Sequence, residues 1–333
     1  MATEVVAATD HAGPHGASGA TRAVGAGIPV EISEGVTRVL APNPGILTGP
    51  GTNTYLIGRE DVAVIDPGPA DPGHIDALLG AVASLSGSLR WVLVTHTHPD
   101  HFPAAAALSA RTGAETIGFG ARDGFVPDRS VGDGFVLHVG GPGGAHLRAL
   151  HTPGHSSNHL CFLLEDTGVL FSGDHIVDGS TVVIAPPDGD MASYLASLER
   201  LRGLHPPISA IAPGHGGVID DPLARIDWYI AHRKEREAAI LEAVARLAPA
   251  GSLDIVRAVY DREPESVYPL AACSVRAHLM KLSHEGAVRA VSSKTPQSAP
   301  AETPPGADDV VVVATSTYVG SSGETDDEWW ELA

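Results

Sequence analysis

The chain has 333 residues, of which 43% are hydrophobic and 18% are charged, so it is long enough for a sizeable core and one additional module. Its net charge of −19 weighs against a polyanionic partner such as RNA, and no run of residues reaches the roughly 18–20 apolar positions of a membrane helix. Two cysteines, Cys161 and Cys273, are too few for a disulfide framework, and the N-terminus lacks the pattern of a secretory signal. A cytoplasmic location is therefore expected.

Both ends of the chain have compositions typical of unstructured segments. Residues 1–27 are rich in Ala, Gly and Thr without a clear period, and they predict a disordered leader. Residues 293–333 are rich in Pro and Ser and contain eight acidic residues but one basic residue, Lys294, so they predict an acidic disordered tail. Within this tail Trp329-Trp330 is a candidate docking motif, although an untethered tail is the favoured interpretation.

Between the two ends, short apolar runs alternate with turn residues over residues 28–225. The runs predict strands at Val36–Leu40, Thr54–Ile57, Val62–Ile65, Trp91–Val94, Gly134–Val139, Leu147–Leu150, Leu160–Leu164, Val169–Phe171 and Ile208–Ile211. Helices are predicted at Pro103–Arg111, which has a proline near its start and Gly113 after its end, and at Met191–Leu201. The mixture of strands and helices predicts an α/β domain.

The pattern changes from about Ile226. Helical spacing of apolar residues predicts helices at Trp228–Leu247, Leu253–Tyr260 and Val275–Leu282, followed by a strand at Val288–Val291. Three helices and a short strand favour a winged-helix-like module over residues 226–292. This module has nine acidic and nine basic residues, so it offers little surface for binding phosphates.

The most informative stretch lies directly after the predicted strand Trp91–Val94. It contains four candidate metal ligands within six residues, namely His96, His98, Asp100 and His101. Alternate residues of an extended segment point the same way, so His96 and His98 can converge on one metal, and the following turn can aim Asp100 and His101 at a second. Imidazole and carboxylate ligands suit zinc, iron or manganese better than calcium.

Three later residues occur in a shared context, in which an apolar run is followed by a turn that contains glycine. They are His155 in His151-Thr152-Pro153-Gly154-His155, Asp174 in Phe171-Ser172-Gly173-Asp174, and His215 in Ala212-Pro213-Gly214-His215. Each is a weak signal alone. Together with the first motif, and in this order, they are a strong signal for a metal site.

An HxHxDH motif followed by His, Asp and His resembles the metallo-β-lactamase superfamily. The resemblance covers about residues 28–221 and implies a four-layer αβ/βα sandwich with the site at one edge of the paired sheets. It implies two divalent metal ions, zinc first and iron or manganese as alternatives. It assigns His96, His98 and His155 to one ion, Asp100, His101 and His215 to the other, and Asp174 as a bridge between them.

The chemistry expected from this site is hydrolysis. Two cations a few ångströms apart lower the pKa of a shared water toward about 7 and so supply a bridging hydroxide at neutral pH. Asp100 is the candidate catalytic residue, because it can also orient the nucleophile or receive a proton. Asp66 lies where the superfamily often has a carboxylate that orients metal-bound histidines, with a plain Asp-Pro turn as the alternative. His159 is a candidate for hydrogen bonding to the substrate.

Finer motifs narrow the resemblance. They are Gly51-Thr52-Asn53-Thr54-Tyr55-Leu56, Thr152-Pro153-Gly154-His155-Ser156-Ser157-Asn158-His159 and Ala185-Pro186-Pro187-Asp188-Gly189-Asp190-Met191. With the C-terminal module, they are similar to a bacterial branch related to lactamase-beta-2-like proteins. Animal relatives of that branch are described as single-strand endoribonucleases, and other relatives act on thioesters, including acyl chains on carrier proteins. Hydrolysis of β-lactams is disfavoured by the absence of an export signal and by the presence of Asp174.

The sequence therefore favours a di-metal hydrolase that cleaves an ester, thioester or phosphodiester bond. The alternatives are a glyoxalase-II-type hydroxyacylglutathione thioesterase, a single-strand endoribonuclease, an iron-dependent oxidoreductase on the same fold, and a binding protein that works through its C-terminal module. The favoured partner is a small-molecule or acyl-carrier substrate. RNA is disfavoured by charge, no membrane partner is expected, and a homodimer is compatible with the sequence.

Overall fold

The structure is a computed structural model that describes residues 25–141, 143–291 and 329–333. The predicted leader up to residue 24 and the predicted tail up to residue 328 lie outside the described residues. The chain forms two compact units, the first ending at Arg233 and the second beginning at Lys234. Within the described ranges, no helix is both long and apolar enough to cross a membrane.

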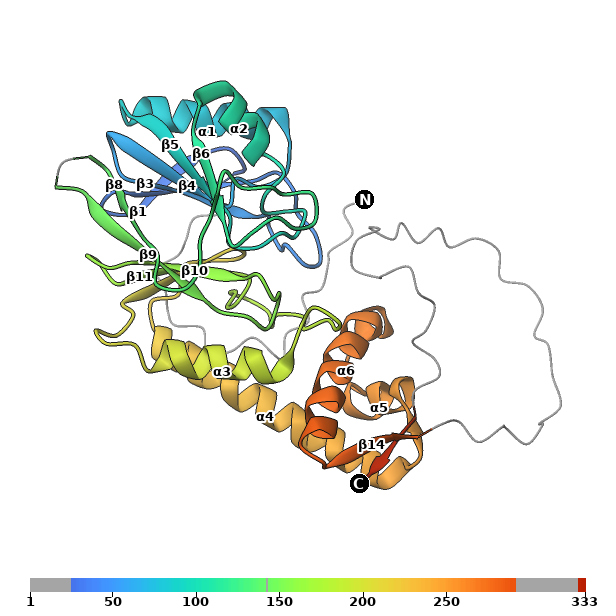
Figure 1. The fold of residues 1–333 in the computed structure, drawn as a ribbon. Helices are drawn as coiled ribbons and strands as arrows, with labels where there is room; N and C mark the ends of the chain where they lie inside the picture. Colours follow the sequence, from blue (N-terminus) through green and yellow to red (C-terminus); the bar gives the residue numbers. More distant parts are fainter. Residues whose placement is uncertain (1–24, 142, 292–328) are drawn as a thin grey trace, which may run out of the picture. The chain divides into compact units, whose positions relative to one another are not determined.

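The first unit contains two β-sheets with helices on their outer faces (Figure 1). The first sheet has seven strands in chain order: β1 (Pro29–Ser33), β2 (Val36–Leu40), β3 (Asn53–Ile57), β4 (Asp61–Ile65), β5 (Ser88–Leu93), β6 (Glu115–Gly118) and β7 (Arg129–Ser130). The strands from β1 to β4 pair antiparallel, and those from β4 to β7 pair parallel. The sheet therefore changes direction at β4, and each parallel step requires a crossover connection.

Two of these crossovers are helices that pack on the outer face of the first sheet, α1 (Pro72–Ser84) and α2 (Ala105–Thr112). The α1 helix was not predicted, although its start signal is present. The side chain of Asp71 accepts a hydrogen bond from the backbone N–H of His74, and a proline occupies the first turn. The α2 helix ends as predicted at Gly113, whose φ of 74° lies in the left-handed region.

The second sheet has five strands in the order β12-β11-β10-β9-β8. They are β8 (Val136–Val139), β9 (Ala145–His151), β10 (Leu160–Leu164), β11 (Val169–Gly173) and β12 (Ala210–Pro213). Strands β11 and β12 pair parallel and the others antiparallel. Helix α3 (Met191–Arg202) and the first turns of α4 (Pro222–Leu247) lie along the outer face of this sheet (Figure 1).

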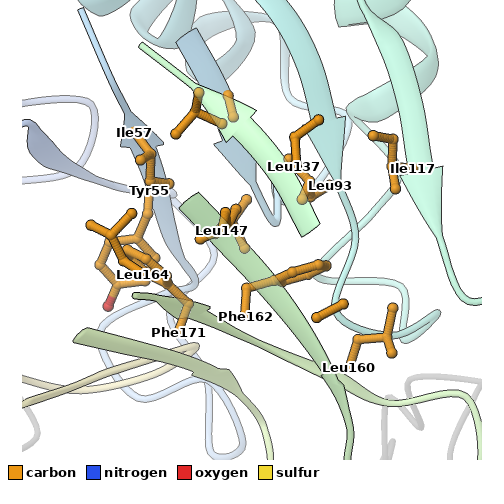
Figure 2. Close-up of a cluster of buried hydrophobic side chains, with 14 of the residues drawn as sticks. Tyr55, Ile57, Leu93, Ile117, Leu137, Leu147, Leu160, Phe162, Leu164 and Phe171 are labelled. Carbon is orange, nitrogen blue, oxygen red and sulfur yellow. The ribbon is translucent and has the colours of Figure 1, made fainter. Parts of the chain in front are cut away.

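The core of the first unit lies between the two sheets (Figure 2). Tyr55 and Leu93 from the first sheet face Phe162 and Phe171 from the second, and none of these side chains is more than 2% exposed. The rings of Tyr55 and Phe171 are 5.1 Å apart. Burying a large apolar side chain contributes about 1.5–3 kcal/mol, so this layer holds the sheets together. The predicted four-layer αβ/βα sandwich is confirmed.

The second unit contains the later turns of α4, which continues across the boundary predicted between residues 225 and 226. It also contains α5 (Ser252–Val259), a 3-10 turn (Glu265–Val267), α6 (Tyr268–His284) and a three-stranded sheet of β13 (Ala250–Gly251), β14 (Val288–Val291) and β15 (Trp329–Leu332). Apolar side chains of α4, α5 and α6 form its core with Val288 and Trp330.

Strand β15 corrects the prediction of a disordered tail for residues 329–332. It lies between β13 and β14 and pairs antiparallel with both. Trp330 faces the core and is 3% exposed, while the Glu331 carboxylate accepts a hydrogen bond from Arg289 at 2.7 Å. The acidic composition of the surrounding residues concealed a short strand that begins with two tryptophans. Trp330 is therefore a core residue of this unit and not part of an exposed docking motif.

Candidate metal centre

The candidate ligands follow the ends of four strands that come from both sheets. The segment from His96 to His101 follows β5 of the first sheet. His155 follows β9, Asp174 follows β11 and His215 follows β12, all of the second sheet. The buried strands place these turns at one edge of the sandwich, because the core between the sheets fixes where each strand ends.

The first ligand group consists of His96, His98, His155 and Asp174, whose ligand atoms all lie within 4.8 Å of one another. Nε2 of His96 is 2.8 Å from Nδ1 of His98, and Nε2 of His155 is 2.9 Å from the same atom. The predicted convergence of His96 and His98 is therefore present, and His155 joins them from 57 residues away along the chain.

The second ligand group consists of Asp100, His101 and His215, whose ligand atoms also lie within 4.8 Å of one another. Oδ2 of Asp100 is 3.4 Å from Nε2 of His101 and 3.2 Å from Nε2 of His215. His101 is fully buried, and His215 is 5% exposed.

Asp174 faces both ligand groups through different oxygen atoms. Its Oδ1 is 3.4 Å from Nε2 of His101 and 3.2 Å from Nε2 of His215. Its Oδ2 is 3.8 Å from Nε2 of His155. The carboxylate thus lies between the two groups, with one oxygen toward each.

Outer contacts fix which nitrogen of three histidines faces the centre. Nδ1 of His155 donates to the carbonyl of Val183 at 2.8 Å, and Nδ1 of His215 donates to the carbonyl of Gly51 at 3.2 Å. Nδ1 of His101 donates to Oδ2 of Asp66 at 2.9 Å. Each of these contacts places a proton on Nδ1 and turns Nε2 inward, so that Nε2 is the nitrogen that binds a metal once the imidazole is neutral.

Asp66 is the carboxylate that supports the second ligand group. Its Oδ1 accepts from the backbone N–H of Thr95 at 2.8 Å, and its Oδ2 accepts from the Thr95 hydroxyl at 2.7 Å in addition to His101. Its φ of 49° is unusual for a residue other than glycine, and the buried hydrogen bonds hold it there. Of the two interpretations of Asp66, orientation of a histidine agrees with these contacts.

The histidines of the first group are held in the neutral state. Burial, together with His101 and His98, lowers the pKa of His96 well below its usual value. Burial and the neighbouring His155 lower the pKa of His98 to about 3. Burial also lowers the pKa of His155, although the carboxylate of Asp174 opposes the shift.

In the second group the pKa values of the histidines are raised instead of lowered. Burial disfavours the charged form of His215, but Asp174 and Asp100 outweigh it and raise the pKa to about 10. For His101 burial is likewise outweighed by Asp100, Asp174 and Asp66, which raise its pKa well above the usual value. The same contacts, led by His101 for Asp100 and by His215 for Asp174, overcome burial and lower the pKa of both carboxylates.

The donor set fits divalent cations. Nε2 of His101 and Oδ1 of Asp174 are buried and form no hydrogen bond with the described residues, although they lie 3.4 Å apart. In the first group, the Nε2 atoms of His96 and His155 both lie within 2.9 Å of Nδ1 of His98. Burying a polar atom without a hydrogen-bond partner or a metal costs folding free energy. Imidazole and carboxylate groups together form a ligand set that zinc, iron and manganese accept.

A family model described as the metallo-beta-lactamase superfamily matches residues 47–215, which is just over half of the chain and contains every candidate ligand. The chain belongs to the metallo-β-lactamase superfamily. The HxHxDH segment and the later His, Asp and His that suggested this family are the residues that the fold brings together.

A second family model, the beta-lactamase associated winged helix domain, matches residues 252–295. This metallo-β-lactamase superfamily chain therefore carries a C-terminal winged helix, as the sequence predicted. The match includes α5, α6 and β14.

Curated relatives extend the match over most of the chain. A beta-lactamase-like protein 2 homolog of Drosophila melanogaster is 34% identical over 79% of this chain and 92% of its own length. A protein of the same description from Caenorhabditis elegans is 33% identical over 78% of this chain and 88% of its own length. Among solved structures, a beta-lactamase domain protein from Burkholderia ambifaria has a TM-score of 0.73 at 22% identity and covers 94% of this chain and 96% of its own. The last comparison supports the fold alone.

The structure gives roles to residues that the sequence motifs could not. Thr52 pairs with His215 as an isolated β-bridge, and its hydroxyl is 3.4 Å from Oδ2 of Asp100. The amide of Asn53 donates to the carbonyls of Pro213 and Gly216 at 2.9 Å, so this segment fixes the turn that carries His215. Within that turn, a Cβ on Gly214 would lie 2.7 Å from Oδ1 of Asp174, which leaves room for hydrogen alone.

His159 lies behind the first ligand group instead of in contact with solvent. It has no exposed surface, its ring centroid is 5.0 Å from that of His96, and its Nδ1 is 3.0 Å from the Thr152 hydroxyl. These contacts agree with support of His96 and leave no path to a substrate. Cys161 is also fully buried, and burial raises the pKa of its thiol to about 12.

Proposed function

We propose that this chain is a hydrolase that uses two divalent metal ions, zinc first, to cleave an ester, thioester or phosphodiester bond. The observation that carries the proposal is the pair of buried ligand groups with Asp174 facing both. Membership of the superfamily supports it, because most members are metal-dependent hydrolases. A cytoplasmic location remains a prediction.

His96, His98, His155 and one oxygen of Asp174 would hold the first ion, and Asp100, His101, His215 and the other oxygen would hold the second. When bound, the ions would polarise the carbonyl or phosphoryl oxygen of the substrate and make a water molecule acidic enough to act as the nucleophile near neutral pH. The chain itself supplies fixed positions for these donors, so little reorganisation accompanies the reaction.

Asp100 is the residue we assign to proton transfer. Its side chain is 22% exposed, compared with 12% for Asp174, so it is the more accessible of the two carboxylates. One of its oxygens faces His101, His215 and the Thr52 hydroxyl, which fixes the carboxylate plane. The other oxygen is available to accept a proton from the nucleophile or to return one to the leaving group.

The nearby hydroxyl and thiol groups do not form an alternative, covalent mechanism. Ser172 donates to the carbonyl of Ile176 at 2.7 Å, and Ser156 contacts Asn158 and Asp188. Cys161 is buried with a raised pKa. Activated nucleophiles need both an adjacent base and access to the substrate, and these three side chains are buried.

A substrate panel with and without metal tests the proposal. Full-length protein is stripped with a chelator, reloaded with zinc, iron or manganese, and assayed on acyl thioesters, S-lactoylglutathione, a lactone, bis-p-nitrophenyl phosphate and single-stranded RNA. We expect about two ions per chain and hydrolysis that is lost on stripping and returns on reloading. Full activity in the presence of the chelator would contradict the proposal, as would oxygen consumption with a persulfide in place of hydrolysis.

A further inference from the structure

A closed ring of side chains in polar contact lies beside the first ligand group. Its six members are Thr97, Asn158, Ser156, Asp188, Arg122 and Asp123, here called the Arg122 ring. They come from four separate segments of the chain. Thr97 lies between His96 and His98, and Ser156 directly follows His155. The ring therefore contacts two of the loops that carry ligands.

The ring begins at Thr97, between the first two ligands. The Thr97 hydroxyl donates to Oδ2 of Asp123 at 2.6 Å and accepts from Nδ2 of Asn158 at 2.9 Å. A hydroxyl has one proton to donate, so donating to Asp123 while accepting from Asn158 fixes the orientation of the Thr97 hydroxyl. Thr97 is 3% exposed and Asn158 is 5% exposed, so water does not compete for the contact between them, whereas the side chain of Asp123 is 55% exposed.

The second half of the ring connects the loop of His155 to the turn before α3. Oγ of Ser156 is 2.7 Å from Oδ1 of Asn158 and 2.8 Å from Oδ2 of Asp188. The backbone N–H of Ser157 donates to the same oxygen of Asp188 at 3.2 Å. This turn also reaches His155 directly, because the carbonyl of Val183 accepts from its Nδ1.

Arg122 closes the ring by joining its two carboxylates. Its guanidinium is 2.8 Å from Oδ1 of Asp188 and 3.3 Å from Oδ2 of Asp123, and it donates to Oγ of Ser157 at 2.5 Å. The arginine side chain is 38% exposed, so the charged half of the ring lies toward the surface and the neutral half lies inside.

We propose that the Arg122 ring is a positioning device that fixes the loop of His98 against the loop of His155, so that the first ligand group is shaped before a metal arrives. The inference rests on the proposed function, in that it assumes the first group binds a metal ion. It assigns no contact with substrate to any ring member. The second group has a separate support in Asp66, whose carboxylate accepts hydrogen bonds from Thr95 and His101.

A matched pair of substitutions separates positioning from general stability. Thr97→Val removes a buried hydroxyl that donates to Asp123, and Thr116→Val removes a buried hydroxyl that donates to Asp128 at 2.8 Å, away from the ligands. Thr97→Ser keeps the hydroxyl and serves as the rescue. Asp123→Asn is the second ring variant, because the φ of 50° at Asp123 is one that asparagine tolerates.

The readout is equilibrium binding of cobalt to the metal-free full-length protein, followed by visible absorption and by competition with a chromogenic chelator. Thr97→Val and Asp123→Asn should lower the affinity for one of the two cobalt ions by about 10–100-fold, as loss of a contact to a metal ligand does. The absorption bands of that ion should also change. The other ion should keep its affinity. Thr116→Val should lower the thermal midpoint without changing either ion, and Thr97→Ser should restore wild-type binding.

The inference would be overturned if Thr97→Val and Asp123→Asn bound both cobalt ions with wild-type affinities and spectra. It would also be overturned if Thr116→Val changed cobalt affinity and absorption as much as the ring variants do. Those outcomes leave the proposed function intact, since wild-type protein still binds two ions and is assayed for hydrolysis separately. Wild-type protein that binds no cobalt would overturn the proposed function and the inference together. Wild-type protein that binds two ions but cleaves no substrate would overturn the proposed hydrolysis alone.

Discussion

The two ligand groups lie side by side and share Asp174, yet the chain prepares them in opposite ways. The first group has three histidines that burial keeps neutral, and neutral side chains fix its loops from within. The second group has two histidines whose protons are held by Asp100, Asp174 and Asp66. The first group is thus ready to receive a cation, whereas the second must first release protons.

This difference suggests a division of labour. A neutral, prearranged imidazole set favours permanent retention of a metal, because no proton competes for its nitrogens. The second group contains Asp100, which is the more exposed of the two carboxylates at the centre. We therefore expect metal retention to depend mainly on the first group and proton transfer mainly on the second.

The largest expected effect comes from the carboxylate assigned to proton transfer. Asp100→Asn preserves size but removes the charge and the basic oxygen, so kcat should fall by about 10²–10⁴-fold. The control is Asp76→Asn, because the Asp76 side chain is 67% exposed and pairs with Arg111 on the surface. Steady-state kinetics on whichever panel substrate is cleaved provides the measurement. Unchanged kcat in Asp100→Asn would show that the division of labour is wrong.

A change of pH should separate the two groups next. Since the pKa of His215 is raised to about 10 and that of His101 lies well above its usual value, both histidines carry protons near pH 7 in the metal-free protein. Metal binding to the second group must displace these protons, so its affinity should rise by about tenfold per pH unit for each proton released. The first group, already neutral, should bind equally well between about pH 7 and about pH 9.

Zinc titrations in buffers of different ionisation enthalpy measure the protons released with each ion. One ion should release almost none, and the other should release protons from His101 and His215. The same number of protons for both ions would mean that the two groups are electrostatically alike, which contradicts the comparison.

A smaller effect is expected at the outer support of the second group. Asp66→Asn retains the side-chain shape but weakens the contacts to His101 and Thr95, so the second ion should bind about 10–100-fold more weakly. The pKa of His101 should also fall in this variant, which partly offsets the loss at neutral pH. Chelator competition at about pH 9 avoids that offset. If this variant weakened binding of the first ion instead, Asp66 would be a support of the first ligand group and not of the second.

The smallest effect on the metal affinity of either ligand group is expected from a substitution in the second unit. Trp330 is 3% exposed in the core of that unit, and Trp330→Ala should destabilise the unit by about 3–5 kcal/mol. All seven candidate ligands precede Arg233, so both metal affinities should stay at the wild-type level. Thermal unfolding and metal titration of the same sample provide the test. A drop in metal affinity would show that the site depends on this unit.

The candidate ligands could be recognised in the sequence because metal chemistry leaves a local pattern. His96, His98, Asp100 and His101 are close in the chain, and the later three residues each follow an apolar run and a glycine turn. Most of the strands could be predicted for a similar reason, since they are buried and bounded by turn residues, whereas the sandwich was implied by the family resemblance of the motifs. The α1 helix was missed although Asp71 and Pro72 marked its start.

The supports of the site are harder to predict. The carbonyls of Val183 and Gly51 orient two histidines, but a backbone carbonyl has no residue type that announces it. The Arg122 ring joins side chains as distant as Thr97 and Asp188, and each alone has the appearance of an ordinary polar loop residue. Strand β15 pairs with strands that precede it by dozens of residues, and an acidic composition hides it. Such features depend on tertiary contacts that no local pattern records.

A zinc titration of metal-free, full-length protein across a range of pH tests the central claim most directly. The two ligand groups predict two ions per chain, one with an affinity that is constant between about pH 7 and about pH 9 and one with an affinity that rises steeply over the same range. Fewer than two ions per chain, or two ions with the same dependence on pH, would contradict the account.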